Sequence, residues 1–299
     1  MDILQIKGLH KRFGDKEVLR GLELSVPEHS IFGFIGKNGS GKTTTMKTVL
    51  GLLSADAGEI RVNGERVAYG ESATNRFIGY LPDVPEFYSF MTAKEYLLFC
   101  GEISGMKKSE STKRADELLS LVGLKDEPHR IKGYSRGMKQ RLGIAQALFA
   151  RPKLLICDEP TSALDPVGRK EILEILSAVR KETTVLFSTH ILSDVERICT
   201  DIAFLDEGVT RVCGTLSDIK ARYGRRAFII ETEKDEDARV LTEALPLLRK
   251  GEKNALSFEE NELSPFTVMD VLAKKRIMPL RFERIEATLE SLFTEVTGK

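Results

Sequence analysis

The chain has 299 residues, which suggests about two domains, each large enough to bury a hydrophobic core. Its 45 basic and 45 acidic side chains cancel, so no net field favours nucleic acid or an anionic membrane, and we expect no nucleic-acid partner. Cys100, Cys157, Cys199 and Cys213 lack zinc-site spacing, and no apolar run reaches about 18 residues, so we expect reduced thiols and a cytosolic chain that does not itself cross a membrane.

The first 28 residues predict two strands, at 4–9 and 18–26, around a polar turn at 14–16. Phe13 lies just before that turn. On the local pattern alone, Phe13 is an ordinary core aromatic.

The stretch 30–51 predicts a short apolar strand, a glycine-rich turn and a helix that begins near Gly41. The turn matches the pattern G-x-x-x-x-G-K-[ST] of a phosphate-binding loop. Glycines let main-chain amides approach phosphate oxygens, and the helix N-terminus favours an anion. The lysine adds charge at the β and γ phosphates, and the hydroxyl of Thr43 can ligate Mg²⁺. The loop residues expected at the nucleotide are Gly36, Lys37, Asn38, Gly39, Ser40, Gly41, Lys42, Thr43 and Thr44.

The segment that follows changes from strand to helix periodicity. Asn63-Gly64 marks a hairpin, and a strand is predicted at 76–81, where Pro82 ends it. Helices are then predicted at 92–104, 111–122 and 137–150.

The next part of the chain alternates apolar strands with helices, which predicts a parallel sheet covered on both faces and makes the helical block at about 84–150 an insertion. The predicted elements are strand 154–157, helix 166–181, strand 184–188, helix 191–198 and strands 202–206 and 209–213.

Three polar residues follow these strands at their carboxyl ends, where open α/β sheets place ligands. Asp158 is expected to hold Mg²⁺, and Glu159 to orient or deprotonate the attacking water. His190 is a candidate for sensing the γ-phosphate and fixing that water, although a lone histidine there is more often structural.

Residues 215–299 differ in composition and predict the order β-α-β-β-α-β-α of a small ferredoxin-like α+β domain. The predicted strands are 227–232, 246–250, 254–259 and 278–284, and the predicted helices are 235–245, 265–275 and 287–297.

Together these motifs resemble the nucleotide-binding subunit of ATP-binding cassette (ABC) transporters over residues 2 to about 214. The most specific feature is the stretch 134–140, YSRGMKQ, which is similar to the family signature in a variant form. The resemblance implies a P-loop ABC ATPase fold in residues 1–214, with an accessory or regulatory domain in 215–299, and the hydrolysis of MgATP.

The resemblance also implies roles for single residues. Phe13 would stack on adenine, while Ser135 and Gly137 would contact the γ-phosphate held by a second copy of the chain. Asp165 would communicate between the copies. The enzyme would therefore act as a head-to-tail dimer that encloses two ATP molecules. Its further partners would be separately encoded integral membrane permease subunits at the inner face of the cell membrane.

Two departures from the family pattern stand out. Asp83 replaces the usual glutamine after the strand that ends at Leu81; it can still ligate Mg²⁺ but cannot donate a hydrogen bond. Arg136 and Met138 replace glycine and glutamine in the signature. Both variants are similar to those of drug, lipid and polysaccharide exporters. The alternative is a soluble ABC ATPase that acts on the ribosome or DNA.

The aromatic residues Phe87, Tyr88 and Phe90 leave two interpretations open. They pack between the core and the helical insertion, or they line a cleft for a cytoplasmic helix of the membrane partner.

Overall fold

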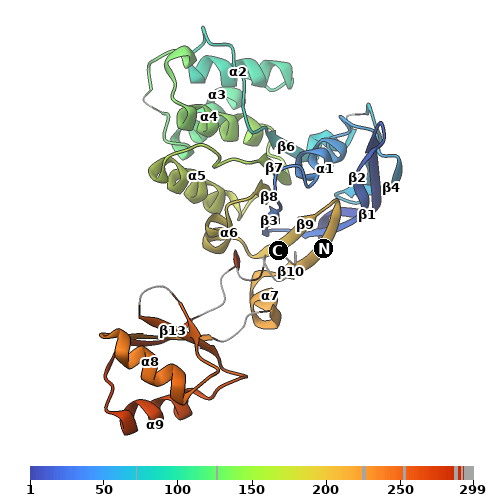
Figure 1. The fold of residues 1–299 in the computed structure, drawn as a ribbon. Coiled ribbons are helices and arrows are strands. Elements are labelled where there is room, and N and C mark those ends of the chain that lie inside the picture. Colours follow the sequence, from blue (N-terminus) through green and yellow to red (C-terminus); the bar gives the residue numbers. More distant parts are fainter. Residues whose placement is uncertain are drawn as a thin grey trace. The chain divides into compact units, whose positions relative to one another are not determined.

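The computed structural model describes residues 1–71, 73–125, 127–223, 227–251, 254–285, 289–290 and 292. The chain divides into two compact units, Met1–Leu216 and Ser217–Lys299 (Figure 1). The sequence analysis placed this boundary two residues earlier. None of the helices within the described ranges is long and apolar enough to cross a membrane.

The first unit begins with an antiparallel sheet of order β2-β1-β4-β5. Apolar side chains alternate along its long strands, so one face is buried. The two strands predicted in the first 28 residues are confirmed and are longer than expected, and Gly14 supplies the positive φ of 57° that the turn between them requires. The strands are β1 (Asp2–Phe13), β2 (Lys16–Pro27), β4 (Ala57–Val62) and β5 (Glu65–Arg66).

A six-stranded sheet of order β10-β9-β3-β8-β7-β6 forms the centre of this unit. Its strands are parallel except for β10, which runs antiparallel to β9. β3, β7 and β8 are buried along their whole length, as their continuous apolar runs predict. The strands are β3 (Ile31–Ile35), β6 (Ile78–Leu81), β7 (Leu154–Asp158), β8 (Thr184–Thr189), β9 (Asp201–Asp206) and β10 (Val209–Thr215).

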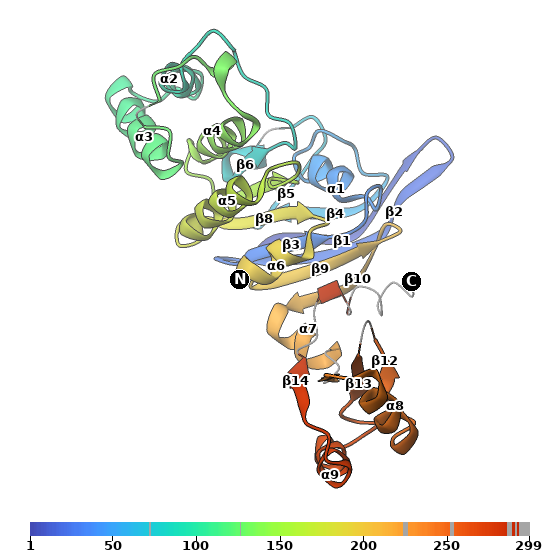
Figure 2. The ribbon, with the colours of Figure 1, turned by 60° about the vertical axis from the view of Figure 1, so that its left-hand side comes forward.

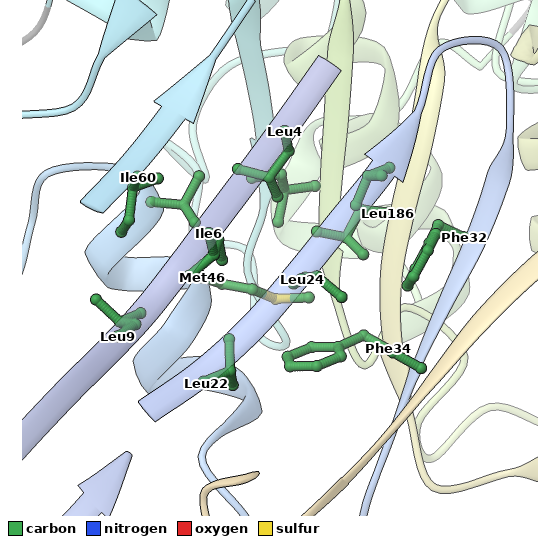
Figure 3. Packing of buried hydrophobic residues seen from close by; sticks show 14 of the residues in the cluster. Leu4, Ile6, Leu9, Leu22, Leu24, Phe32, Phe34, Met46, Ile60 and Leu186 are labelled. Carbon is green, nitrogen blue, oxygen red and sulfur yellow. The ribbon is translucent and has the colours of Figure 1, made fainter. Parts of the chain in front are cut away.

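A hydrophobic core lies between these two sheets and includes residues of helix α1 (Lys42–Val49). Figure 3 shows Leu4 from β1, Leu24 from β2 and Phe34 from β3 around Met46 of α1. The sequence predicts that helices cover both faces of the parallel sheet. This is wrong for one face, which packs against the antiparallel sheet as well as α1. The alternating strands β1 and β2 have an apolar face of their own to bury, and this sheet-on-sheet contact buries it.

The helical insertion is confirmed and consists of α2 (Ala93–Ile103), α3 (Lys108–Leu121), the short 3₁₀ helix Ile131–Gly133 and α4 (Arg136–Leu148) (Figure 2). α4 joins the insertion to the sheet by packing on β6. A Cβ on Gly143 of α4 would lie 2.5 Å from Leu81, and one on Gly79 of β6 would lie 2.1 Å from the Ala147 carbonyl oxygen. The two elements therefore approach closely only because these positions are glycine.

Two further helices of this unit also match their predictions. α5 (Pro166–Val179) begins with a proline in its first turn, and α6 (Leu192–Ile198) lies against β3. The predicted strand 76–81 is wrong at its start, because residues 73–77 form a 3₁₀ helix before β6. Helix α7 (Leu216–Tyr223) was not predicted.

Within its described residues, the second unit contains most of α7 and a four-stranded antiparallel sheet of order β12-β13-β11-β14 with helices α8 and α9, which is the ferredoxin-like arrangement that the sequence predicts. Its core gathers Ile230, Leu241, Phe258 and Leu272. The predicted strand 246–250 is shorter than expected, because only its last two residues pair, and the predicted helix 287–297 lies largely outside the described residues. The elements are β11 (Ala227–Thr232), α8 (Asp235–Ala244), β12 (Arg249–Lys250), β13 (Ala255–Glu259), α9 (Pro265–Lys275) and β14 (Pro279–Ile285).

Candidate functional site

The glycine-rich turn connects buried strand β3 to helix α1. Gly39 and Gly41 have positive φ angles of 81° and 112°, a region that side chains with a Cβ rarely adopt. A Cβ on Gly36 would lie 2.5 Å from the Leu205 carbonyl oxygen of β9. The turn therefore wraps tightly against the sheet and directs the N-terminus of α1 into the space above it, as anion binding requires.

Lys42 is buried at the start of α1, with a side chain only 6% exposed. Its ammonium group donates to the carbonyl oxygens of Gly36, at 2.7 Å, and Lys37, at 3.3 Å. The same nitrogen lies 3.3 Å from Oε1 of Glu159. The positive charge is therefore held at the centre of the turn and faces the acidic end of β7.

The acidic residues lie where β7 and β8 end side by side, with Asp158 in register with Ser188. The Ser188 hydroxyl donates to Asp158 Oδ1 at 2.6 Å and accepts from the Glu159 main-chain N–H at 3.0 Å. Ser188 is fully buried and Asp158 nearly so. One buried hydroxyl thus fixes both acidic residues relative to each other.

Glu159 adopts an unusual backbone conformation, with φ of 49°, just beyond the end of β7. Its side chain is 14% exposed, and Oε2 lies 2.9 Å from His190 Nδ1. The histidine follows β8 and is about half exposed. One carboxylate oxygen of Glu159 therefore contacts Lys42 and the other contacts His190. Backbone conformations as unusual as that of Glu159 are found most often at functional sites.

A cavity of about 620 Å³ opens over the turn and the ends of the strands. Phe13 lies at its edge with 48% of its surface exposed, so it is not the core aromatic that its local pattern indicates. Lys11 Nζ lies 5.4 Å from the centre of the Phe13 ring. The residues that line the cavity are Phe13, Lys16, Val18, Asn38, Gly39, Gly41, Lys42, Thr43, Thr44, Asp83, Asp158 and Glu159.

Asp83 reaches this cavity from the segment that follows β6. Partial burial raises the pKa of its carboxyl group; the nearby Arg136 charge acts in the opposite direction, and Asp158 and Glu159 raise the pKa further. Its Oδ1 lies 3.2 Å from a guanidinium nitrogen of Arg136, and its main-chain oxygen accepts from Gln140 at 2.6 Å.

The donor set of the cavity fits a hard divalent cation. The Thr43 hydroxyl and the carboxylates of Asp83 and Asp158 are oxygen ligands of the kind that Mg²⁺ prefers, together with water and phosphate oxygens. Within the described ranges, the protein does not gather three or more His, Cys, Asp or Glu side chains into a metal cluster. The cation would therefore depend on the nucleotide for part of its coordination, as Mg²⁺ at phosphate sites does.

The remaining predicted site residues lie outside the lining of this cavity. Gly36, Lys37 and Ser40 belong to the turn itself. Ser135 and Asp165 are N-cap residues of α4 and α5, where their oxygens accept from the amides of Met138 and Gly168. Together with Gly137 of α4, they are not brought to the nucleotide cavity of their own chain.

Sequence reasoning missed Ser188, and it missed Lys16 and Val18 at the cavity wall. A signal for Ser188 was available, because it is a polar residue near the carboxyl end of a buried strand, as Asp158 is. Another missed group is the buried Asp194, which accepts from Thr161 and from Arg169, both at 2.7 Å. This group ties the loop after β7 to α5 and α6.

Comparisons with known proteins agree with this geometry. The family model described as "ABC transporter" matches residues 19–162. The chain is 36% identical over 98% of its length to the uncharacterized ABC transporter ATP-binding protein YxlF of Bacillus subtilis, of which it covers 99%. It is 40% identical over 69% of its length to the bacitracin transport ATP-binding protein BcrA of Bacillus licheniformis, of which it covers 67%. A solved structure titled as the ATP binding subunit of an ABC transporter matches 74% of this chain and 93% of its own, with a TM-score of 0.66 and 33% identity.

Proposed function

The chain belongs to the ABC transporter family of ATP-binding subunits, which hydrolyse ATP and work with membrane permease subunits, and we propose that it powers export through permeases encoded separately from it. The relative BcrA, named for bacitracin transport, supports the export assignment. The names of both relatives refer to transport, which favours this function over the alternative of an ATPase on the ribosome or DNA.

The observation that carries the proposed mechanism is the meeting of Lys42, Asp158 and Glu159 in one cavity. Lys42 would exchange its present carbonyl and carboxylate partners for the β and γ phosphates, and the ring of Phe13 would stack on adenine. Thr43, Asp83 and Asp158 would hold Mg²⁺, which would neutralise charge on the phosphates. Asn38 to Gly41 and Thr44 would supply further contacts to the phosphates.

Glu159 is the residue best placed to accept a proton from the attacking water. One of its oxygens lies beside Lys42, and binding of the phosphates by Lys42 would release that oxygen toward the γ-phosphate. His190 contacts the other oxygen and would keep the carboxylate in place. Glu159 thus acts as the general base and His190 as its positioning partner.

Two copies of the chain would complete each site. Ser135 and Gly137 lie at the N-terminus of α4, and Asp165 caps α5, yet none of the three lines the cavity of its own chain. A helix N-terminus favours an anion, which suits contact with the γ-phosphate of a second copy. The proposed form is a head-to-tail dimer with two enclosed ATP molecules.

An aromatic surface on the helical insertion supports a contact with the permease at the inner face of the membrane. Phe87 packs edge-on against Tyr96 at 5.1 Å between ring centres, which fits the packing interpretation. Tyr88 and Phe90 are 52% and 62% exposed, and their ring centres lie 5.9 Å apart, which fits the interface interpretation. We assign the outer pair to the permease contact, and we assign residues 215–299 an accessory role.

The first test is Glu159→Gln, examined by light scattering with and without MgATP and by ATPase assay. The proposal predicts a nucleotide-dependent dimer and hydrolysis lowered by a factor of at least about 100, in the range of removing a general base. A monomer under all conditions would refute dimer formation by this chain alone, and undiminished hydrolysis would refute the role of Glu159.

The permease contact is tested with the double variant Tyr88→Ser, Phe90→Ser in the assembled transporter. Transport should fall while the isolated subunit keeps its ATPase rate and its melting temperature. An unfolded variant would show instead that the outer aromatic pair is part of the core.

A further inference from the structure

The two departures from the family pattern, Asp83 and Arg136, contact each other although 53 positions separate them. Oδ1 of Asp83 lies 3.2 Å from a guanidinium nitrogen of Arg136, and both side chains are nearly half exposed. An exposed ion pair of this kind is weak, so a stronger anion can displace the carboxylate.

Several residues along one face of α4 contact the segment that contains Asp83. Arg136 contacts the Asp83 carboxylate, and one turn later Gln140 donates to its main-chain oxygen at 2.6 Å. One further turn along, Gly143 packs against Leu81 and Pro85. Because the main chain is held by the buried Gln140 and by Gly143, the carboxylate and Arg136 can separate without moving the helix.

The surroundings of Arg136 favour an anion other than Asp83. It occupies the first turn of α4, between Ser135 and Gly137, and that turn contains no acidic residue. The positive end of the helix dipole and the guanidinium therefore add their positive potentials at one place. Asp83 itself lines the nucleotide cavity and also contacts Arg136 at this helix end.

We propose that Arg136 changes partners: it pairs with Asp83 when the two copies are apart, and with the γ-phosphate bound to the second copy when the dimer closes. This inference rests on the proposed ATP-bound dimer. The arginine would strengthen closure through a charge-assisted hydrogen bond that glycine at this position cannot make. Asp83 would oppose closure weakly, because its contact with Arg136 must first break.

The experiment measures the ATP concentration for half-maximal dimerisation by light scattering in the Glu159→Gln background. Adding Arg136→Gln should raise this concentration about tenfold or more, as expected for loss of a hydrogen bond to a charged group. Arg136→Lys should restore most of the effect, because it keeps the charge. Lys132→Gln, which removes an exposed cation four residues earlier, is the matched control and should change nothing.

The partner exchange itself is tested with Asp83→Asn, which keeps an oxygen for the cation but removes the charge. It should lower the required ATP concentration about two- to fivefold, the range for an exposed ion pair, and it should have no effect when Arg136→Gln is also present. Binding of a fluorescent ADP analogue to the monomer should be the same in the parent and in Arg136→Gln, because ADP lacks the γ-phosphate.

Three outcomes would overturn the inference. If Arg136→Gln dimerises like the parent and like Lys132→Gln, the arginine has no role across the dimer. An Asp83→Asn effect that persists without Arg136 would place Asp83 outside the exchange. A parent that stays monomeric with MgATP would refute dimer formation by this chain alone, and with it an exchange driven by that dimer; dimerisation of the parent separates these cases.

Discussion

Ser188→Ala is expected to weaken both the fold and the hydrolysis of ATP, because one buried hydroxyl serves both acidic residues of the site. It donates to the Asp158 carboxylate at 2.6 Å and accepts from the Glu159 N–H at 3.0 Å. A hydrogen bond to a charged group contributes about 1.5–3 kcal/mol, and one to a main-chain amide about 1 kcal/mol. The two together predict a loss of about 2.5–4 kcal/mol from the free energy of unfolding.

The assay is thermal unfolding of the nucleotide-free chain beside its ATPase rate. For a unit of this size, the melting temperature falls by about 2–4 °C per kcal/mol, which gives a decrease of roughly 5–16 °C. The hydrolysis rate constant should fall at least about tenfold, because Glu159 loses the contact that fixes its unusual backbone, and small misplacements of reacting groups are costly.

Ser30→Ala is the matched control, since it removes a hydroxyl that is also buried and donates to the Pro27 carbonyl oxygen at 2.7 Å. This variant should lower the free energy of unfolding by only about 1 kcal/mol and leave the hydrolysis rate unchanged. Equal melting temperatures and equal rates for the two variants would refute the reasoning, because Ser188 would then contribute no more than an ordinary neutral hydrogen bond.

Two further predictions concern packing and the thiols. Gly79→Ala should destabilise the chain by about 3 kcal/mol in chemical denaturation, because its Cβ would lie 2.1 Å from the Ala147 oxygen, whereas Gly133→Ala, with nothing within 4 Å, should cost less than about 1 kcal/mol. A Gly79→Ala variant as stable as the control would show that α4 and β6 can separate freely. For the thiols, burial raises the pKa of Cys157, Cys199 and Cys213 alike, so exposure sets the order of reaction. The exposed Cys213 should react first with a thiol reagent at pH 8, while the buried Cys157 and Cys199 stay unreactive until the chain unfolds. Rapid native labelling of Cys157, detected by mass spectrometry, would contradict this order.

Much of the fold was predictable because its signals are local. The phosphate loop depends on glycines within a few positions of Lys42, and the buried strands show themselves as continuous apolar runs such as 154–157. The ferredoxin-like order of the second unit also follows from its alternation of strands and helices. Helix α7 escaped prediction, and the strand predicted at 246–250 was too long, because a helix of eight residues and a strand of two leave little periodicity to detect.

The sequence by itself thus determined the nucleotide loop, the acidic strand end at Asp158 and Glu159, and the division into two units, since each depends on neighbours along the chain. Only the tertiary structure decided that the first strands form a separate sheet against the central one, that Phe13 lies exposed at the cavity, and that Ser188 joins the two acids. It also decided that Asp83 meets Arg136. These pairings join residues tens of positions apart, and the free energy that selects them comes from burial and electrostatic contacts across elements, which no local pattern records.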